Sequence, residues 1–409
     1  MTDKGSGRAA RVLGLAAAAA VAGALLAGPA QAEGVVLGAD GPTAIGGHYI
    51  VTLAAGTAAA TVDTSASGLA GRYGGEVTGT YTSALRGFSV AMSGDEARRL
   101  AADPAVASVE ADSAVTAQGV QPNPPNWGLD RIDQRNLPLD HSYTYPNDGS
   151  GVRAYILDTG VYKGHKTFGT RVAAGVDLVD NDGLPDDCNG HGTHIAGIVG
   201  GTEYGVAKKV TIVPVRVLDC NGSGTTAGVI AGIDWVTRNA IKPAVANMSL
   251  GGGVSAALDA AVTNSIASGV GYSVAAGGSA ANACNYSPAR VAPAMTVGAT
   301  TITDARASHS NYGTCLDIFA PGQSITSAWI GGGTATATLS GSSMSAAFVT
   351  GAAALYLHRY PTATPAQVAS ALSSNCTKGV ITGAGTGSPN CLLYVGFIPP
   401  DPFGEPGTG

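Results

Sequence analysis

The feature that most constrains the fold is an alternation of short apolar segments with helix-like segments after Trp127. The apolar segments lack a regular alternation with polar residues, which is typical of strands buried on both faces of a parallel sheet. They span residues 152–157, 210–218, 245–250, 270–275 and 294–297. The helical patterns span residues 191–199, 226–238, 256–268, 345–356 and 365–373. This order predicts an α/β domain with a doubly wound, mostly parallel sheet over residues 119–398, whose ligands bind outside the carboxyl ends of the strands.

A different pattern precedes this domain, in residues 33–118. Ser93 and Glu96 have the spacing of a capping box, which predicts a helix that ends near Ala102. The remaining elements are a strand at 48–53, a helix at 62–73 and strands at 76–80, 84–91 and 106–110. The order β-α-β-β-α-β predicts a small α+β domain of the ferredoxin-like type. The proline-rich residues 121–125 indicate a linker after it.

Residues 1–32 have the pattern of a secretory signal peptide. Three basic residues precede an apolar run at 12–27, and Ala30-Gln31-Ala32 supplies a small-x-small cleavage site. The alternative is a membrane anchor, but the run is shorter than the roughly 20 apolar residues that a span needs. We therefore predict cleavage after Ala32, an extracellular location and no membrane partner.

Composition narrows the classes of partner. Charged residues make up 12% of the chain and the net charge is −6, values that exclude a disordered polyelectrolyte and give no electrostatic reason to bind nucleic acid. Sixty of the 409 residues are glycine, about twice the usual share. Such a share indicates tight turns and close approach of the backbone to other groups. The Pro- and Gly-rich residues 399–409 predict a disordered tail.

Six cysteines in an exported chain make disulfides possible, and six allow fifteen connectivities. They are Cys188, Cys220, Cys284, Cys315, Cys376 and Cys391. Pairing neighbours along the chain would close loops that each stabilise the fold by roughly 3 to 4 kcal/mol. The chain has no C-x-x-C motif and no Cys/His cluster with ligand spacing, so a zinc site is not expected.

Three polar residues stand at positions suited to chemistry. Asp158 follows the apolar run RAYIL, His191 lies between glycines in NGHGTH before a small-residue helix, and Ser343 lies in LSGSSM before an apolar helix. Each has a structural explanation when taken alone, as a turn aspartate, a helix-cap histidine and an N-cap serine. Together they follow the chain order Asp…His…Ser of one class of serine hydrolase.

The chemistry of acyl transfer asks for these three residue types. A serine hydroxyl is a weak nucleophile until a base takes its proton. Imidazole titrates near neutrality and can take and return that proton. A buried carboxylate fixes the imidazole tautomer and stabilises the imidazolium. A helix N-terminus at Ser343 would add partial positive charge near a developing oxyanion.

From Trp127 to about Tyr394 the chain resembles the subtilisin-like serine peptidases, in the proteinase K and aqualysin branch. The segments that carry the resemblance are ILDTG, NGHGTHIAG, GVAKKV, VRVLDCNGSGTT, VANMSLGGG, CNYSPARVAPAMTVGAT, SNYGTCLDIFAPG and LSGSSM. Residues 48–118 resemble the inhibitory propeptide of the same family, through YGGEVTGTY and LRGFSVAMS.

The resemblance implies roles for particular residues. It makes Asp158, His191 and Ser343 the catalytic triad, and it places the substrate as an extended strand against two segments: Gly222-Ser223-Gly224 and Ser249-Leu250-Gly251. Members of the aqualysin branch pair the cysteines that match Cys188–Cys220 and Cys284–Cys315. A third bridge, Cys376–Cys391, is expected from spacing alone.

The resemblance also implies cofactors and partners. The chemistry requires no cofactor. A structural calcium is expected near Asp317, Ala292 and Ala294. The alternative for Asp317 is a capped residue in a turn. The expected partners are a peptide or protein substrate and the chain's own propeptide, an intramolecular inhibitor that is removed near residue 118. We expect a monomer.

The chain departs from the family pattern in three places. The family places an oxyanion-binding Asn where this chain has Gly278, so the backbone N–H of Ser343 remains, with Ser279 or Asn282 as conceivable substitutes. Residues 341–348 read GSSMSAAF in place of GTSMATPH, and His309 replaces an aromatic residue. Three functions follow as alternatives: a secreted, self-processing serine endopeptidase, a pseudo-peptidase that only binds peptides, and an acyl-transfer or dedicated processing enzyme. The complete triad favours the endopeptidase.

Overall fold

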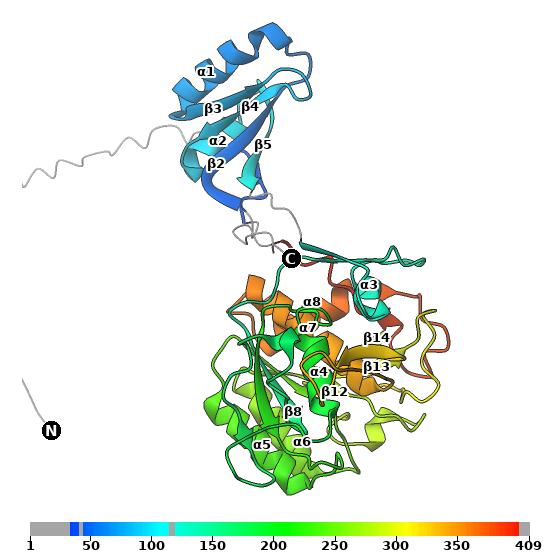
Figure 1. The fold of residues 1–409 in the computed structure, drawn as a ribbon. Helices are drawn as coiled ribbons and strands as arrows, with labels where there is room; N and C mark the ends of the chain where they lie inside the picture. Colours follow the sequence, from blue (N-terminus) through cyan, green and yellow to red (C-terminus); the bar gives the residue numbers. More distant parts are fainter. Residues whose placement is uncertain (1–32, 41–43, 114–118, 401–409) are drawn as a thin grey trace, which may run out of the picture. The chain divides into compact units, whose positions relative to one another are not determined.

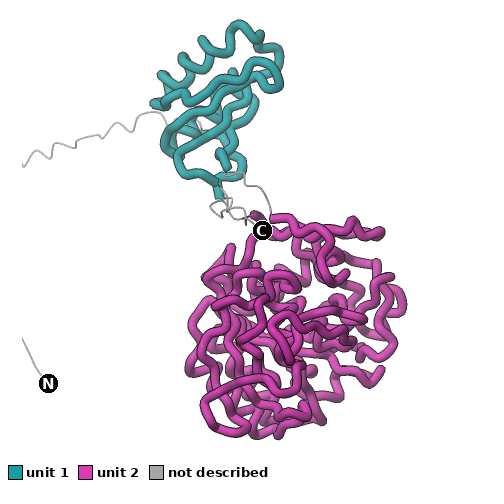
Figure 2. The backbone as a smooth tube through the Cα atoms, viewed as in Figure 1, with its two compact units in different colours: residues 1–113 teal, residues 114–409 magenta. Residues whose placement is uncertain are grey.

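The computed structural model describes residues 33–40, 44–113 and 119–400. The chain divides into two compact units, Met1–Ser113 and Ala114–Gly409 (Figure 2). The predicted signal peptide, the predicted domain boundary near residue 118 and residues 401–409 of the predicted tail lie outside the described residues. In the described part of the chain, no helix is both long and apolar enough to cross a membrane.

The first unit is a five-stranded sheet with two helices, and its strand order is β1-β5-β2-β4-β3. Its elements are β1 Val36–Leu37, β2 Ala44–Leu53, η1 Ala59–Thr61, α1 Val62–Tyr73, β3 Glu76–Tyr81, β4 Gly87–Ala91, α2 Gly94–Ala101 and β5 Val106–Ser113. Apart from the short β1, this is the predicted β-α-β-β-α-β order. The predicted capping box starts α2, because the Ser93 side chain accepts from the Glu96 N–H and the Glu96 side chain accepts from the Ser93 N–H.

The second unit is built on a nine-stranded sheet with the order β17-β18-β14-β13-β12-β11-β8-β10-β9. Only β17 and β18 are antiparallel; every other neighbouring pair in this sheet is parallel. The strands are β8 Arg153–Asp158, β9 Val176–Asp177, β10 Thr211–Arg216, β11 Ala244–Met248, β12 Gly271–Ala275, β13 Met295–Thr300, β14 Ile318–Pro321, β17 Thr377–Lys378 and β18 Cys391–Leu392. The predicted α/β class with a mostly parallel sheet is confirmed.

Helices cover both faces of this sheet, so that its strands lie between two layers (Figure 1). One core contains residues of α3 Trp127–Ile132, α4 His191–Gly200, α7 Ser342–Arg359 and α8 Pro365–Asn375, and the other contains residues of α5 Thr226–Asn239 and α6 Ala256–Ala267. Successive residues of β8 alternate between the two: Ala154 and Ile156 lie in the first core, Tyr155 and Leu157 in the second. Burial on both faces explains the absence of polar alternation in these strands.

Smaller elements complete the second unit. Two antiparallel pairs of strands join β6 Gly119–Pro122 to β7 Ser142–Tyr145 and β15 Ile325–Ala328 to β16 Thr336–Leu339. Two single-turn helices, η2 Lys166–Phe168 and η3 Ala283–Asn285, lie in connecting loops. The strand β6 extends into the segment 121–125 that the sequence pattern assigned to a linker, because Gln121 and Pro122 pair with β7.

The topology brings several strand and helix ends to one place. The strand β8 has β10 on one side and β11 on the other, so the winding direction of the sheet reverses beside it. Ligands bind at such reversal points, outside the carboxyl ends of the strands. Asp158 is the last residue of β8, and β11 and β12 end just before Ser249 and Ala276.

One predicted boundary near this place is wrong. The helix α7 begins at Ser342, three residues before the predicted start at 345. The small polar residues at 342–345 have no helical periodicity, but Gly341 precedes them as the N-cap. Ser343 therefore lies inside the first turn of α7.

Candidate active site

Asp158 and His191 form the centre of the site. The carboxylate of Asp158 is fully buried, and its Oδ1 lies 2.7 Å from Nδ1 of His191, the first residue of α4. The same Oδ1 accepts the backbone N–H of Thr159 at 2.8 Å. Asp158 Oδ2 is buried and has no hydrogen-bond partner among the described residues. The two residues, separated in the sequence, are brought into direct contact.

The surroundings tune the imidazole of His191. Burial acts to lower its pKa, whereas the charge and hydrogen bond of Asp158, and then the charge of Asp187, act to raise it; the net result is a raised pKa. The next histidine of the helix, His194, behaves differently. Burial first, and then the charge of His191, lower its pKa to about 4, and its Nε2 lies 3.1 Å from the carbonyls of Ile325 and Ala337. His194 is therefore a neutral donor that fixes the β15–β16 hairpin against α4.

The local sequence explains how His191 reaches the start of α4. Gly190, the N-cap, has φ 110°, and a Cβ there would lie 2.4 Å from the Trp329 ring. A Cβ on Gly192 would lie 2.1 Å from the carbonyl oxygen of Gly160. Only glycine fits both positions, so the glycines of the NGHGTH motif let α4 begin directly against the loop after β8.

Ser343 is the second residue of α7 and is held by the segment after β11. Its Oγ donates to the carbonyl of Ser249 at 3.3 Å, and Ser249 Oγ donates to the carbonyl of Ser343 at 2.8 Å. Asn247 Nδ2 donates to Ser249 Oγ at 2.8 Å. Among the described residues, Ser343 Oγ is hydrogen-bonded to this carbonyl and not to His191.

Two cavities adjoin at these residues. The first, which we call the His191 cavity, has a volume of about 530 Å³ and is lined by His191 and by both predicted substrate-binding segments, residues 222–224 and 249–251. The second, which we call the Ser343 cavity, has a volume of about 600 Å³ and is lined by Ser343 and Gly278. Residues 249–253 line both cavities. Neither 222–224 nor 249–251 is paired as a strand in the described part of the chain, although the N–H groups of Gly222 and Ser223 already donate to Asp219.

Gly278 lies in the loop after β12 with open space beside it. A Cβ placed there would meet nothing within 4 Å, and its φ lies outside the left-handed region. Ser342 Oγ accepts the N–H of the preceding Gly277 at 3.0 Å. Gly278 itself therefore offers no side-chain amide to an oxyanion, and the space beside it is open to a side chain.

The neighbours of Gly278 are used elsewhere. Ser279 lines the Ser343 cavity and its N–H donates to Asn311 Oδ1, whereas Asn282 Oδ1 accepts the N–H of Cys284 in η3 and Asn282 does not line the cavity. His309 lines the cavity, but its Nε2 is buried and has no partner among the described residues. Of the two conceivable substitutes for the missing donor, only Ser279 faces the cavity.

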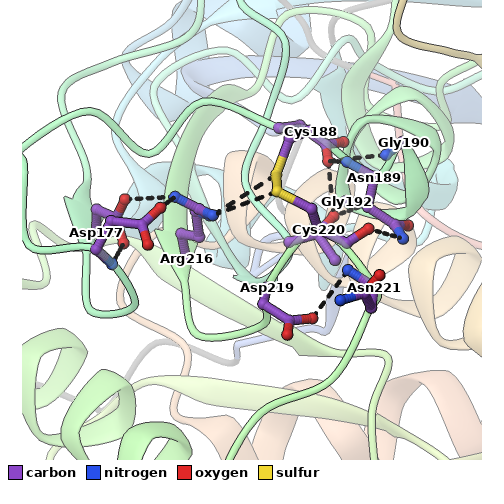
Figure 3. Close-up of a disulfide and its surroundings, with 12 residues drawn as sticks. Asp177, Cys188, Asn189, Gly190, Gly192, Arg216, Asp219, Cys220 and Asn221 are labelled. Carbon is purple, nitrogen blue, oxygen red and sulfur yellow. Dashed lines mark hydrogen bonds and ion pairs between the residues drawn. A yellow bond between two sulfur atoms is a disulfide. The ribbon is translucent and has the colours of Figure 1, made fainter.

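A disulfide joins the loop before His191 to the chain just before residues 222–224. Cys188 is bonded to Cys220, and Asn189 Nδ2 donates to the Cys220 carbonyl at 3.0 Å (Figure 3). The guanidinium of Arg216 lies against both sulfurs and pairs with Asp177 at 2.7 Å (Figure 3). The structure also contains the disulfides Cys284–Cys315 and Cys376–Cys391, and it has no free cysteine among the described residues.

The residues expected to bind calcium offer few ligands. Asp317 Oδ2 accepts the N–H of Thr296 at 2.7 Å, and burial raises the pKa of Asp317 to about 6. The other expected ligands, Ala292 and Ala294, could supply only carbonyl oxygens. In the described part of the chain, no group of three or more His, Cys, Asp or Glu side chains is arranged to hold a metal. One carboxylate and two carbonyls fit a hard cation only if water completes its shell of six to eight oxygens.

Sequence reasoning missed two groups in this site. Asp187 and Thr159 are buried and link the loop after β8 to the first turn of α4, Thr159 with its hydroxyl and Asp187 with its carboxylate. A signal for Asp187 exists in the sequence, because an aspartate just before a helix start is a common partner of unpaired N–H groups. The hydroxyl of Thr159 has no such signal, since its role depends on contacts between distant segments.

The α/β fold, the paired Asp158 and His191, and Ser343 at the adjoining cavity fit the class of serine hydrolases. Residues 149–391 match the Subtilase family model, and residues 48–118 match the Peptidase inhibitor I9 model. The chain therefore belongs to the subtilase family. It is a secreted subtilisin-like serine endopeptidase that carries a propeptide of the I9 type, as the sequence resemblance predicted.

Individual relatives agree with this assignment. The chain is 56% identical over 383 residues to the extracellular serine proteinase of Thermus sp. (strain Rt41A), a match that covers 89% of this chain and 93% of that protein. It is 51% identical over 331 residues to the alkaline serine exoprotease A of Vibrio alginolyticus, covering 80% of this chain and 61% of that one. A crystal structure of a cold-adapted subtilisin-like serine proteinase is 56% identical, with a TM-score of 0.64, and covers 66% of this chain and 97% of that chain.

Removal of the Cys188–Cys220 bridge should affect both stability and activity. The double variant Cys188→Ala/Cys220→Ala should lose roughly 3 kcal/mol in free energy of unfolding and should also lower kcat/KM several-fold, because the bridge holds the His191 loop on the 222–224 segment. The matched variant Cys376→Ala/Cys391→Ala should lose similar stability with kcat/KM unchanged. Denaturant unfolding and peptide hydrolysis measure both, and equal kcat/KM in the two variants would show that Cys188–Cys220 acts on stability alone.

Proposed function

We propose that Ser343, His191 and Asp158 cleave peptide bonds through an acyl-enzyme. The observation that carries this proposal is the buried contact of 2.7 Å between Asp158 Oδ1 and His191 Nδ1, at a cavity that shares residues 249–253 with the cavity lined by Ser343. An Nδ1–H directed at Asp158 leaves the lone pair on Nε2, the tautomer that a general base needs. Nε2 takes the proton of Ser343 Oγ as the hydroxyl attacks the scissile carbonyl, and returns it to the leaving amine.

The second half of the reaction uses the same groups. Water attacks the acyl-enzyme while Nε2 takes its proton, and Ser343 leaves with that proton to regenerate the free enzyme. The backbone N–H of Ser343, in the first turn of α7, stabilises the oxyanion in both steps, helped by the positive end of the helix. The pseudo-peptidase alternative is not needed, because all the groups that these steps require are present.

We further propose how the substrate binds and how the enzyme matures. An extended peptide pairs its backbone with residues 222–224 and 249–251, which explains why glycine recurs in these segments. Residues 33–118 form the inhibitory propeptide, the mature peptidase spans 119–398, and cleavage near residue 118 separates them. The mature enzyme acts as a monomer on peptide or protein substrates. Any structural calcium is held by Asp317 with the carbonyls of Ala292 and Ala294, where it would reverse the raised pKa of that carboxyl.

Replacement of Ser343 tests the proposal directly. Ser343→Ala should abolish peptide hydrolysis and self-processing near residue 118, because no nucleophile remains. The exported chain should keep its full propeptide by mass spectrometry. Ser370→Ala, on the exposed face of α8, should mature and hydrolyse as the parent does. A Ser343→Ala chain that matures unaided would disprove the assignment of the nucleophile.

Gly278→Asn should raise kcat with KM changed by less than about twofold. The side chain fits into open space, and an amide donor there would act mainly on the transition state. In subtilisin, the loss of the corresponding donor lowers kcat by about 10²–10³, which sets the upper limit of the gain. The control is Gly278→Ala, which adds the Cβ without a donor and should leave kcat unchanged. If Gly278→Asn leaves kcat flat, another group already binds the oxyanion.

A further inference from the structure

Asp187 is a buried carboxylate that none of the steps above uses. Its Oδ1 accepts from Thr159 Oγ1 at 2.9 Å and from the N–H groups of Asn189 and Gly190 at 2.9 and 2.8 Å. Its Oδ2 accepts from the N–H and the hydroxyl of Thr193 at 2.9 and 2.6 Å. None of these donors is a cation, so neutral dipoles alone stabilise the charge. Five such bonds on a side chain that is 8% exposed hold the carboxylate in one place.

The start of α4 depends on this carboxylate. Its N-cap, Gly190, has no side chain to accept from the first turn. Asp187 therefore takes the N–H of Thr193, and Thr159 Oγ1 takes that of Gly192 at 2.9 Å. A carboxylate near a helix N-terminus is also favoured by the helix dipole. Asp187 thus does the work of a capping residue from outside the helix.

The same contacts reach the Asp158–His191 pair from both sides. Thr159 donates its hydroxyl to Asp187 and its N–H to Asp158 Oδ1, the oxygen that faces His191 Nδ1. On the other side, His191 is the residue next to Gly190 and two before Thr193, both of which are bound to Asp187. One side chain therefore anchors both segments whose relative position sets the distance between Oδ1 and Nδ1.

We propose that Asp187 is a positioning residue of the reaction, which holds the loop after β8 and the first turn of α4 so that His191 stays aligned on Asp158. This inference deepens the proposed function and rests on it. Asp187 acts through Thr159 and the backbone of α4, at a distance from the reacting atoms.

The charge of Asp187 supplies a readout that a purely structural residue would lack. The titratable groups that act on His191 are Asp158 from β8, Asp187 from the preceding loop and His194 from α4 itself. Asp187 raises the pKa of His191, after the larger effects of burial and of Asp158. Because the base must be neutral, loss of this negative charge should let activity persist to lower pH.

The experiment is the pH profile of kcat and kcat/KM for Asp187→Asn. Its plateau kcat should fall about tenfold, the effect of losing one hydrogen bond to a charged group, with KM within about twofold. The acidic limb of kcat/KM should move to lower pH. An unchanged plateau or an unmoved limb would overturn the proposal.

Two further sets of variants keep the test decisive. Asp130 in α3 is 2% exposed and accepts the N–H groups of Asp140 and His141, so Asp130→Asn removes a comparable carboxylate. It should lower stability and leave the acidic limb in place, and a moved limb would overturn the proposal. Thr159→Val should lower the plateau kcat without moving the acidic limb of kcat/KM. Thr159→Ser keeps the hydroxyl and should retain kcat. Equal kcat in these two variants would contradict the link from Asp187 through Thr159 to Asp158.

These outcomes separate the inference from the proposed function. Activity that survives in Ser343→Ala would refute the catalytic assignment itself. An enzyme that requires Ser343 but is indifferent to Asp187→Asn would refute only the positioning role. If Asp187→Asn does not mature unaided, a trace of the parent enzyme can process it before the profile is measured.

Discussion

The hydrogen bond between the buried carboxylate of Asp158 and Nδ1 of His191 is the constraint on which the rest of the site depends. A desolvated carboxylate is costly unless it is hydrogen-bonded, and here the Thr159 N–H and the imidazole supply the bonds. The contact requires that β8 end inside the molecule and that α4 begin against the next loop. The two-sided burial of β8 and the glycines at 190 and 192 satisfy these requirements. The sheet topology and the start of α4 thus create the contact that sets the imidazole tautomer of His191.

Ser343 and the segment after β11 are held together by a second set of contacts. Ser249 is hydrogen-bonded to Ser343 in both directions, and the same strand-following segment lines both cavities. A peptide paired with residues 249–251 would therefore lie close to Ser343. Gly278 is the exception to this preorganisation, because the wall of the Ser343 cavity is open where a donor would stabilise the transition state. In the proposed mechanism the site therefore binds and attacks a peptide with less electrostatic stabilisation of the oxyanion than the family pattern provides.

Much of the fold could be predicted from the sequence because local signals and burial agree. The apolar runs at β8, β11 and β12 and the capping box at Ser93 each specify one element, and the structure contains them. The start of α7 at Ser342 could not be predicted, because small polar residues have no periodicity and Gly341 is a weak signal. Short strands such as β9 and β17 exist only through pairing with neighbours that are distant in the sequence.

The residues of the site also fall into those that the sequence could predict and those that it could not. The chain order of Asp158, His191 and Ser343 was visible because each residue stands next to glycine or at an element boundary. Thr159 was not visible, because its hydrogen bonds reach 28 and 33 residues along the chain. Asp187 had only the signal of an aspartate near a helix start, and its link to Thr159 required the structure. The open space beside Gly278 could be seen only in the structure, because a glycine in the sequence does not show whether other groups fill the space of the missing side chain.

The central claim is that His191, aligned by Asp158, activates Ser343 as a nucleophile. Labelling of the mature enzyme with a serine-directed fluorophosphonate, followed by peptide mapping, tests this claim most directly. We expect one label per molecule, located on Ser343, with a rate that falls in acid as His191 becomes protonated. Absence of labelling, or labelling of a different serine at the same rate, would contradict it.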